Sequence, residues 1–266
     1  MTVKRIQILK PKYYFLCILI SFISLSVSAQ GKFSLGIDAG VRNEKARFDD
    51  PQGYIFRDLW PSATIGLAAT YEYSDRWEFE LGVYRTTFNV AISAYYREPG
   101  YMPFTRYGNQ GGGGFATLQI PLRAIYSPGI QFRKFSLHFF GGVIMLQQFE
   151  FKSSTGFRGA GTDVFPQPAP TIGMEYASEI SNRSSIALEL GSEIRYQLSR
   201  RFHLAYRFSG NLGTTAKVRI YGEYFASNNP QVIHDFEVLQ RGTSLNHFLS
   251  IRYKLGKKIE KEKWWE

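Results

Sequence analysis

The chain has 266 residues with 25 glycines, 16% aromatic residues and a formal net charge of +10, a composition that suits one large all-β domain with many turns. Its modest mean hydropathy argues against a bundle of apolar membrane-spanning helices, although it is compatible with strands that are apolar on one face only. The Lys and Arg residues are scattered along the chain, which argues against nucleic acid as a partner.

Residues 1–29 are typical of a cleaved secretory signal peptide. A basic segment precedes the apolar run 13–25, which is shorter than the about 20 residues that a transmembrane helix needs. The small residues of the sequence Val-Ser-Ala at 27–29 predict cleavage before Gln30. The single cysteine, Cys17, lies inside this segment, so the mature chain is predicted to have neither disulfides nor thiol chemistry.

Beyond the signal, apolar residues alternate with polar or small residues, and this period of two is typical of β-strands. The clearest case is the hairpin that begins at Ile186 and turns at Ser199-Arg200-Arg201. Its arms are long enough for tilted strands to cross a bilayer, which takes about 9–11 residues. The predicted strands are 33–41, 65–73, 77–96, 118–126, 135–151, 186–198, 202–221 and 245–255.

The connections between these strands alternate between short turns and long loops. Short turns are predicted at 74–75, 127–129 and 199–201, and long loops at 43–61, 97–113, 152–170 and around 228–230. The segment 171–181 also alternates, so ten strands are the alternative to eight. A further crossing here would divide 184–198 into two arms of about seven residues, which is too short to span. We therefore expect 171–181 to extend the barrel wall above the membrane.

Eight strands with short turns at one end and long loops at the other are typical of an outer-membrane barrel. Aromatic residues gather near both ends of the strands, as expected at two lipid–water interfaces. The sequence thus predicts an all-β, antiparallel, up-and-down transmembrane β-barrel over 30–256, followed by a charged periplasmic tail at 257–266. The alternative is a soluble, lipocalin-like barrel, which is disfavoured because its interior would have to be apolar.

In each predicted strand every second position is polar or small, and together these positions carry charges of both signs. Because eight strands enclose a space that side chains just fill, we predict that these charges pair across the lumen and close it. The predicted lumen residues are Asp38, Arg42, Glu72, Glu78, Glu80, Arg123, Glu189, Glu193, Arg195, Arg207, Arg219 and Arg252.

Three segments carry a resemblance to a known group of proteins. The signal ending VSA-Q at 27–30, the turn YQLSRRF at 196–202 and the final strand LNHFLSIRYKLG at 245–256 resemble small outer-membrane β-barrel proteins of the OmpA/OmpX-like, "porin family" type of Gram-negative bacteria. The resemblance implies insertion with the short turns in the periplasm, and it implies no single activity. Such chains commonly stop at an aromatic residue of the last strand, whereas here eleven residues follow Leu255.

The four histidines offer little support for catalysis. A lipid-modifying barrel enzyme would need a histidine beside a serine and a carboxylate. His247 and Ser250 are the nearest candidates, but positions three apart on a strand point to opposite faces. His138 and His203 share the charged parity and are expected to form hydrogen bonds in the lumen, and His234 falls in a loop. We therefore expect that the protein is not an enzyme.

No cofactor or metal is predicted. Asp49, Asp50 and Asp58 lack the spacing of an EF-hand loop. The glycine run 111–114 is not followed by the Lys-Ser/Thr of a phosphate-binding loop.

The sequence predicts a structural or interaction protein of the outer membrane that acts through long extracellular loops. A narrow pore for ions or small solutes is the alternative. The expected partners are outer-membrane lipids, the barrel assembly machinery and an extracellular or periplasmic protein, with no nucleic acid among them.

Overall fold

The computed structural model describes residues 32–57, 61–89, 92–94, 107–108, 114–149, 154–160, 172–226 and 228–255. The predicted signal peptide and the predicted tail lie outside these residues. Within the described ranges, no helix is both long and apolar enough to cross a membrane.

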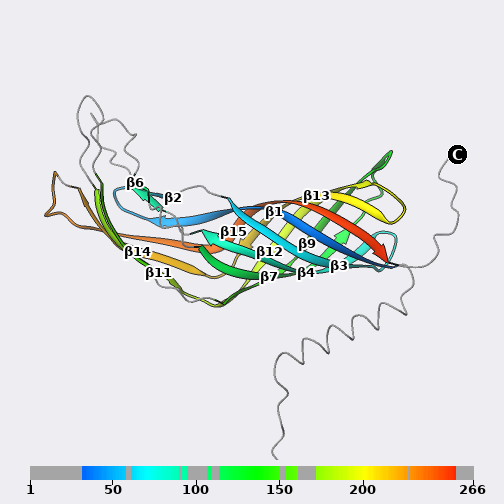
Figure 1. Ribbon diagram of the computed structural model, residues 1–266, viewed down its shortest axis with the longest axis horizontal. Helices are drawn as coiled ribbons and strands as arrows, with labels where there is room; N and C mark the ends of the chain where they lie inside the picture. Colours follow the sequence, from blue (N-terminus) through cyan, green and yellow to red (C-terminus); the bar gives the residue numbers. More distant parts are fainter. Residues whose placement is uncertain are drawn as a thin grey trace, which may run out of the picture.

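Eight long antiparallel strands close into a barrel, which confirms the predicted fold class and strand number (Figure 1). In the order of pairing they are β1 (Phe33–Asp49), β3 (Ser62–Glu72), β4 (Trp77–Asn89), β7 (Gly114–Tyr126), β9 (Phe135–Gln148), β12 (Ser184–Gln197), β13 (Phe202–Gly213) and β15 (His234–Leu255). Pairing between β1 and β15 closes the ring, with Ile37 opposite Ile251. Closure leaves no free edge in the described part of the eight-stranded ring, as a barrel in hydrocarbon requires.

The two ends of the barrel differ. At the turn end, short turns connect β3 to β4, β7 to β9 and β12 to β13. Aromatic pairs bridge neighbouring strands there, with ring centroids 4.8 Å apart for Phe135 and Tyr196 and 5.0 Å apart for Trp77 and Tyr126. Tyr and Trp rings of this kind suit a lipid–water interface. At the loop end, the four long connections begin and end.

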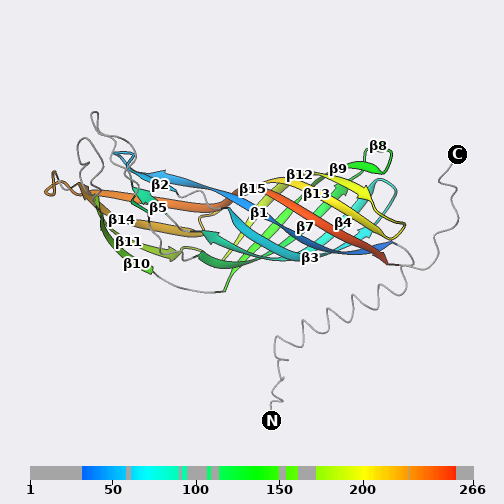
Figure 2. The same cartoon turned by 45° about the horizontal axis from the view of Figure 1, so that its top comes forward.

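A sheet extension continues the wall beyond the loop end (Figures 1 and 2). Its strands are β14 (Val218–Ala226), β11 (Ile172–Ile180) and β10 (Ser154–Ala160), which pair in that order outward from the first half of β15. The expectation that 171–181 extends the wall without crossing is therefore confirmed. Four short strands remain: β2 (Ile55–Arg57), β5 (Ile92–Ala94) and β6 (Tyr107–Gly108) form a separate sheet, and β8 (Gln131–Phe132) pairs with β9.

Several predicted boundaries at the loop end were wrong. The loop predicted at 43–61 begins only after β1 ends at Asp49. The seventh barrel strand does not run through Tyr221, because β13 ends at Gly213 and the chain turns into β14. The fourth long loop is largely the β14–β15 hairpin, so the last strand begins at His234. Part of the loop predicted at 152–170 is strand β10.

The errors at the end of β1 and at the start of β15 share one physical cause, which is that the two faces of the sheet exchange character at the loop end. In β14, Val218 and Ile220 are fully buried whereas Arg219 and Glu223 are exposed. In the barrel, Leu188 is exposed whereas Glu189 is buried. Along a continuous strand the alternation persists beyond this boundary, but the apolar residues now occupy the inner face and the polar residues the outer face. The sequence pattern therefore looks broken although the strand continues. This reversal is expected where a strand leaves lipid and enters water.

Candidate functional site

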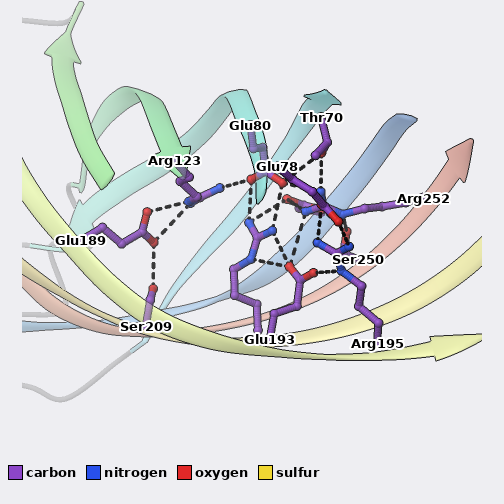
Figure 3. Close-up of polar contacts among 12 residues, drawn as sticks. Thr70, Glu78, Glu80, Arg123, Glu189, Glu193, Arg195, Ser209, Ser250 and Arg252 are labelled. Atoms are coloured by element: carbon purple, nitrogen blue, oxygen red, sulfur yellow. Dashed lines mark hydrogen bonds and ion pairs between the residues drawn. The ribbon is translucent and has the colours of Figure 1, made fainter. Parts of the chain in front are cut away.

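The barrel interior holds a dense cluster of charged side chains, and Glu80 on β4 lies at its centre (Figure 3). Arg123 on β7 donates from Nη1 to Glu80 Oε1 at 2.6 Å. Arg207 on β13 donates from Nη1 and Nη2 to the two carboxylate oxygens of Glu80 at 2.9 and 3.0 Å. Arg252 on β15 forms a further ion pair with the same carboxylate. Three strands are thus joined to a fourth through one buried carboxylate.

The pairs continue in both directions from Glu80. Arg207 also donates to Glu193 Oε2, from Nε at 2.9 Å, and Glu193 in turn pairs with Arg195. Arg195 donates from Nη1 and Nη2 to the carboxylate of Glu78 at 2.6 and 2.8 Å. On the other side, Arg123 donates from Nε to Glu189 at 2.6 Å. We call this series the charge ladder; its members are Glu78, Arg195, Glu193, Arg207, Glu80, Arg123 and Glu189, with Arg252 beside Glu80.

Neutral side chains complete the charge ladder, and of these only Ser250 stands out in the sequence, where it was considered for catalysis and not for the lumen. Asp38 accepts hydrogen bonds from the hydroxyls of Tyr84 and Ser250, while the guanidinium of Arg207 lies 3.6 Å away. Ser209 donates to Glu189 at 2.9 Å. These residues share the inward parity of the charged ones, which is the signal that could have identified them. Satisfying each buried carboxylate in this way limits the cost of desolvating it.

Eight of the twelve predicted lumen residues form the charge ladder and Asp38 borders it at Arg207, whereas the other three lie apart. Arg42 lies closer to the loop end, where Nε contacts Glu44 at 2.7 Å and Nη2 donates to the Gly242 carbonyl at 3.0 Å. Glu72 is the last residue of β3 and pairs with Lys254 at 2.8 Å at the partly exposed turn end.

Arg219 belongs to the sheet extension and not to the lumen. Its side chain is 45% exposed and pairs with Glu237 on β15, with Glu179 Oε1 3.6 Å away. The prediction failed because it carried the parity of β13 through residues 214–217, where the strand is interrupted.

An apolar layer covers the charge ladder toward the loop end. It consists of Phe88, Ile144 and Leu146 from the barrel strands together with Val218 and Ile220 from β14, each exposed by 1% or less. The Arg42 guanidinium lies 5.0 Å from the centroid of the Phe88 ring, so cation–π contact joins the charged and apolar layers. The described part of the lumen is therefore filled first by paired charges and then by packed apolar side chains.

Lys217, which precedes β14, ties this layer to the barrel. Its ammonium donates to the carbonyls of Leu146 at 2.9 Å and Arg183 at 3.0 Å, and the side chain is fully buried. Burial and the nearby charge of Arg42 lower the pKa of Lys217 to about 8. The lysine thus links the start of the sheet extension to the ends of β9 and the turn before β12.

The outer wall of the barrel is apolar. Leu188, Leu190 and Ile194 on β12 are 52%, 74% and 47% exposed, whereas Glu189 and Glu193 between them are buried. A soluble barrel would place these residues the other way round, so the lipocalin-like alternative was wrong. A closed barrel with an apolar outside, a paired ionic inside and an aromatic belt defines the class of transmembrane β-barrels.

The histidines form no complete catalytic group in the described structure. His247 and Ser250 lie on opposite faces of β15, as predicted, and His247 Nδ1 contacts the Tyr206 hydroxyl at 2.7 Å on the outer wall. Within the lumen, His138 Nε2 lies 2.9 Å from Ser136 Oγ, but no hydrogen-bond partner reaches His138 Nδ1 among the described residues. A hydrolytic triad needs an orienting acid at that atom. Among all the residues that the structure describes, no group of three or more His, Cys, Asp or Glu side chains could hold a metal ion.

Comparison with known proteins gives a structural likeness alone. No protein-family model matches the sequence, and neither does any curated protein. Among solved structures, the chain is similar to the outer membrane protein OprG from Pseudomonas aeruginosa, with 14% identity, a TM-score of 0.42 and coverage of 86% of this chain and 98% of that one. It is also similar to Outer Membrane Protein W of E. coli, with 14% identity, a TM-score of 0.39 and coverage of 85% and 98%. Likeness at this level carries no argument about activity.

Proposed function

We propose that this protein is an outer-membrane β-barrel that works as a structural or interaction protein and not as a pore. The observation that supports this proposal is the two-layered filling of the lumen by the charge ladder and the apolar layer. An eight-stranded barrel has room for little more than its own side chains. Here the charge ladder is joined by ion pairs and the apolar layer is packed, so a hydrated path would require both layers to separate.

The sheet extension is the surface that we propose for partner binding. It projects beyond the barrel wall, and its outer side carries a groove of about 440 Å³ lined by residues of β1, β14 and β15. Carboxylates of Asp49, Glu223, Asp235 and Glu237 flank Tyr221 in this groove. A sheet with an apolar inner face and a polar outer face is stable in contact with water. Such a sheet suits binding to an extracellular protein. We also propose that the barrel assembly machinery inserts the protein and that outer-membrane lipids surround it.

Electrical recording tests the closed lumen. Purified protein inserted in planar bilayers is expected to give no steady single-channel conductance, because ions would have to enter a dry apolar layer and disrupt buried ion pairs. A general porin recorded in the same buffer serves as the positive control. Large and steady currents from the unmodified protein would contradict the proposal and favour the narrow pore.

Orientation is tested by labelling single cysteines on whole cells. We expect Asn229→Cys, in the turn of the β14–β15 hairpin, to react with an impermeant thiol reagent, because long connections face outward. The matched variant Ser199→Cys, in the turn between β12 and β13, should react only after the outer membrane is permeabilised. The opposite pattern would place the sheet extension in the periplasm.

A further inference from the structure

One hairpin at the turn end protrudes from the barrel wall. Among the strands that the structure describes, β8 pairs only with the start of β9, through Gln131 opposite Ser136 and Phe132 opposite Phe135. Figure 2 shows this hairpin bending away from the barrel beside the label β8. Every residue from 129 to 135 is exposed. We call residues 129–135 the hairpin tip.

The hairpin tip exposes large apolar side chains next to the lipid-facing wall. Phe132 is 70% exposed, and Ile130, which lies just before β8, is 56% exposed. Phe135, which lies opposite Phe132, belongs to the aromatic belt through its contact with Tyr196. The apolar surface of the wall thus continues onto the tip, where such residues would be unfavourable in water.

Two cations complete the hairpin tip. The Arg133 guanidinium lies 5.5 Å from the centroid of the Phe132 ring, and Lys134 follows it. Neither side chain forms an ion pair with an acid within the described ranges. The rest of the turn end is also basic: Lys32, Arg76, Arg200, Arg201 and Lys254 accompany them, against the acids Glu72 and Asp75. The cations at the tip are therefore free to bind an anion.

The backbone conformation at Arg133 indicates that the arginine side chain, and not the shape of the turn, is the reason for this residue. Arg133 has φ of 55°, the only positive value for a residue other than glycine in the described part of the chain. Two-residue hairpin turns favour glycine or asparagine at such a position, because other side chains clash with the backbone there. Glycine would give the same turn without this strain. A strained residue that local structure does not need points to a role outside the turn.

We propose that the hairpin tip is an interfacial binding site for anionic phospholipid head groups. Ile130 and Phe132 enter the boundary of the acyl chains, while Arg133 and Lys134 bind the phosphate. The guanidinium group matches phosphate oxygens with two parallel donors, and basic residues beside inserted apolar ones are the combination that anionic membrane surfaces attract. The inference rests on the proposed membrane location, since the wall beside the tip must face lipid.

The test measures lipid selectivity in bilayers. The full mature chain is reconstituted in phosphatidylcholine membranes that contain either spin-labelled phosphatidylglycerol or spin-labelled phosphatidylcholine, and the immobilised fraction of each probe is compared. We expect the protein to prefer phosphatidylglycerol, and Arg133→Gly to weaken that preference by up to roughly fivefold at low salt, the effect of one basic residue near a charged surface. Because glycine relieves the strained turn, thermal stability should stay equal or rise.

The controls separate this inference from the proposed function. Arg241→Ser removes an exposed basic residue at the loop end and should leave the preference unchanged; an equal loss would mean a general charge effect and would overturn the site. Unchanged selectivity in the double variant Arg133→Gly/Lys134→Ser would also overturn it. If no probe of either kind is immobilised by the protein, the membrane barrel itself is wrong.

Discussion

Replacing Arg207 with alanine is expected to lower the free energy of unfolding by about 3–5 kcal/mol, the cost of breaking a buried ion pair by removing one partner. Arg207 joins the two carboxylates at the centre of the charge ladder, Glu80 and Glu193, and all three side chains are exposed by 1% or less. Without the guanidinium, Glu193 retains Arg195, and Glu80 retains Arg123 and Arg252. Each nevertheless loses a donor that water cannot replace in the packed lumen.

Equilibrium unfolding in urea, followed by the loss of the folded band on unheated gels, measures this effect. Arg219→Ala is the matched control, because that arginine also pairs with a glutamate but is 45% exposed on the sheet extension. An exposed pair contributes little to stability, because solvent screens it. Similar small losses from both variants would show that the lumen is hydrated and that the charge ladder is not a closed network.

Replacing Leu188 with arginine is expected to cost about 2–4 kcal/mol, the penalty for a basic residue on the lipid face near the middle of a membrane barrel. Leu188 lies in the interior of β12, between Val143 and Leu212 on the neighbouring strands, and is 52% exposed. If the protein were soluble, the same change at an exposed position would alter stability by no more than about 0.5 kcal/mol. The prediction therefore distinguishes lipid from water at this wall.

Folding into phosphatidylcholine vesicles, with urea titration of the folded fraction, gives the required free energies. Tyr221→Arg is the control, since Tyr221 is 38% exposed on β14 in the sheet extension, beyond the loop end of the barrel. It should change stability little. Equal penalties at the two positions, or none at either, would contradict the placement of the membrane between the turn end and the sheet extension.

The barrel itself could be predicted from the sequence because each lipid-crossing strand has one apolar and one polar face. The parity of Glu80, Glu189 and Arg207 placed them in a shared interior before any strand pairing was known. The partners of each charge could not be predicted, because residues such as Arg207 and Glu80 are far apart in the chain and meet only when β4 and β13 face each other across the lumen. Neutral side chains that contact the charge ladder, such as Tyr84, were missed because a single tyrosine at an inward-facing position does not stand out in the sequence.

By itself, the sequence determined that the strands are amphipathic and that short turns alternate with long loops along the chain, and it favoured eight crossing strands over ten. Only the tertiary structure decided where the two faces exchange character, since a period of two is the same whichever face is buried. That exchange is why a loop was predicted around 228–230 where the structure has the β14–β15 hairpin, and the interruption at 214–217 places Arg219 on the outer surface instead of in the lumen. The exchange also supplies the apolar layer of Phe88 and Leu146 that covers the charge ladder, because burial depends on neighbours that the closed barrel brings together.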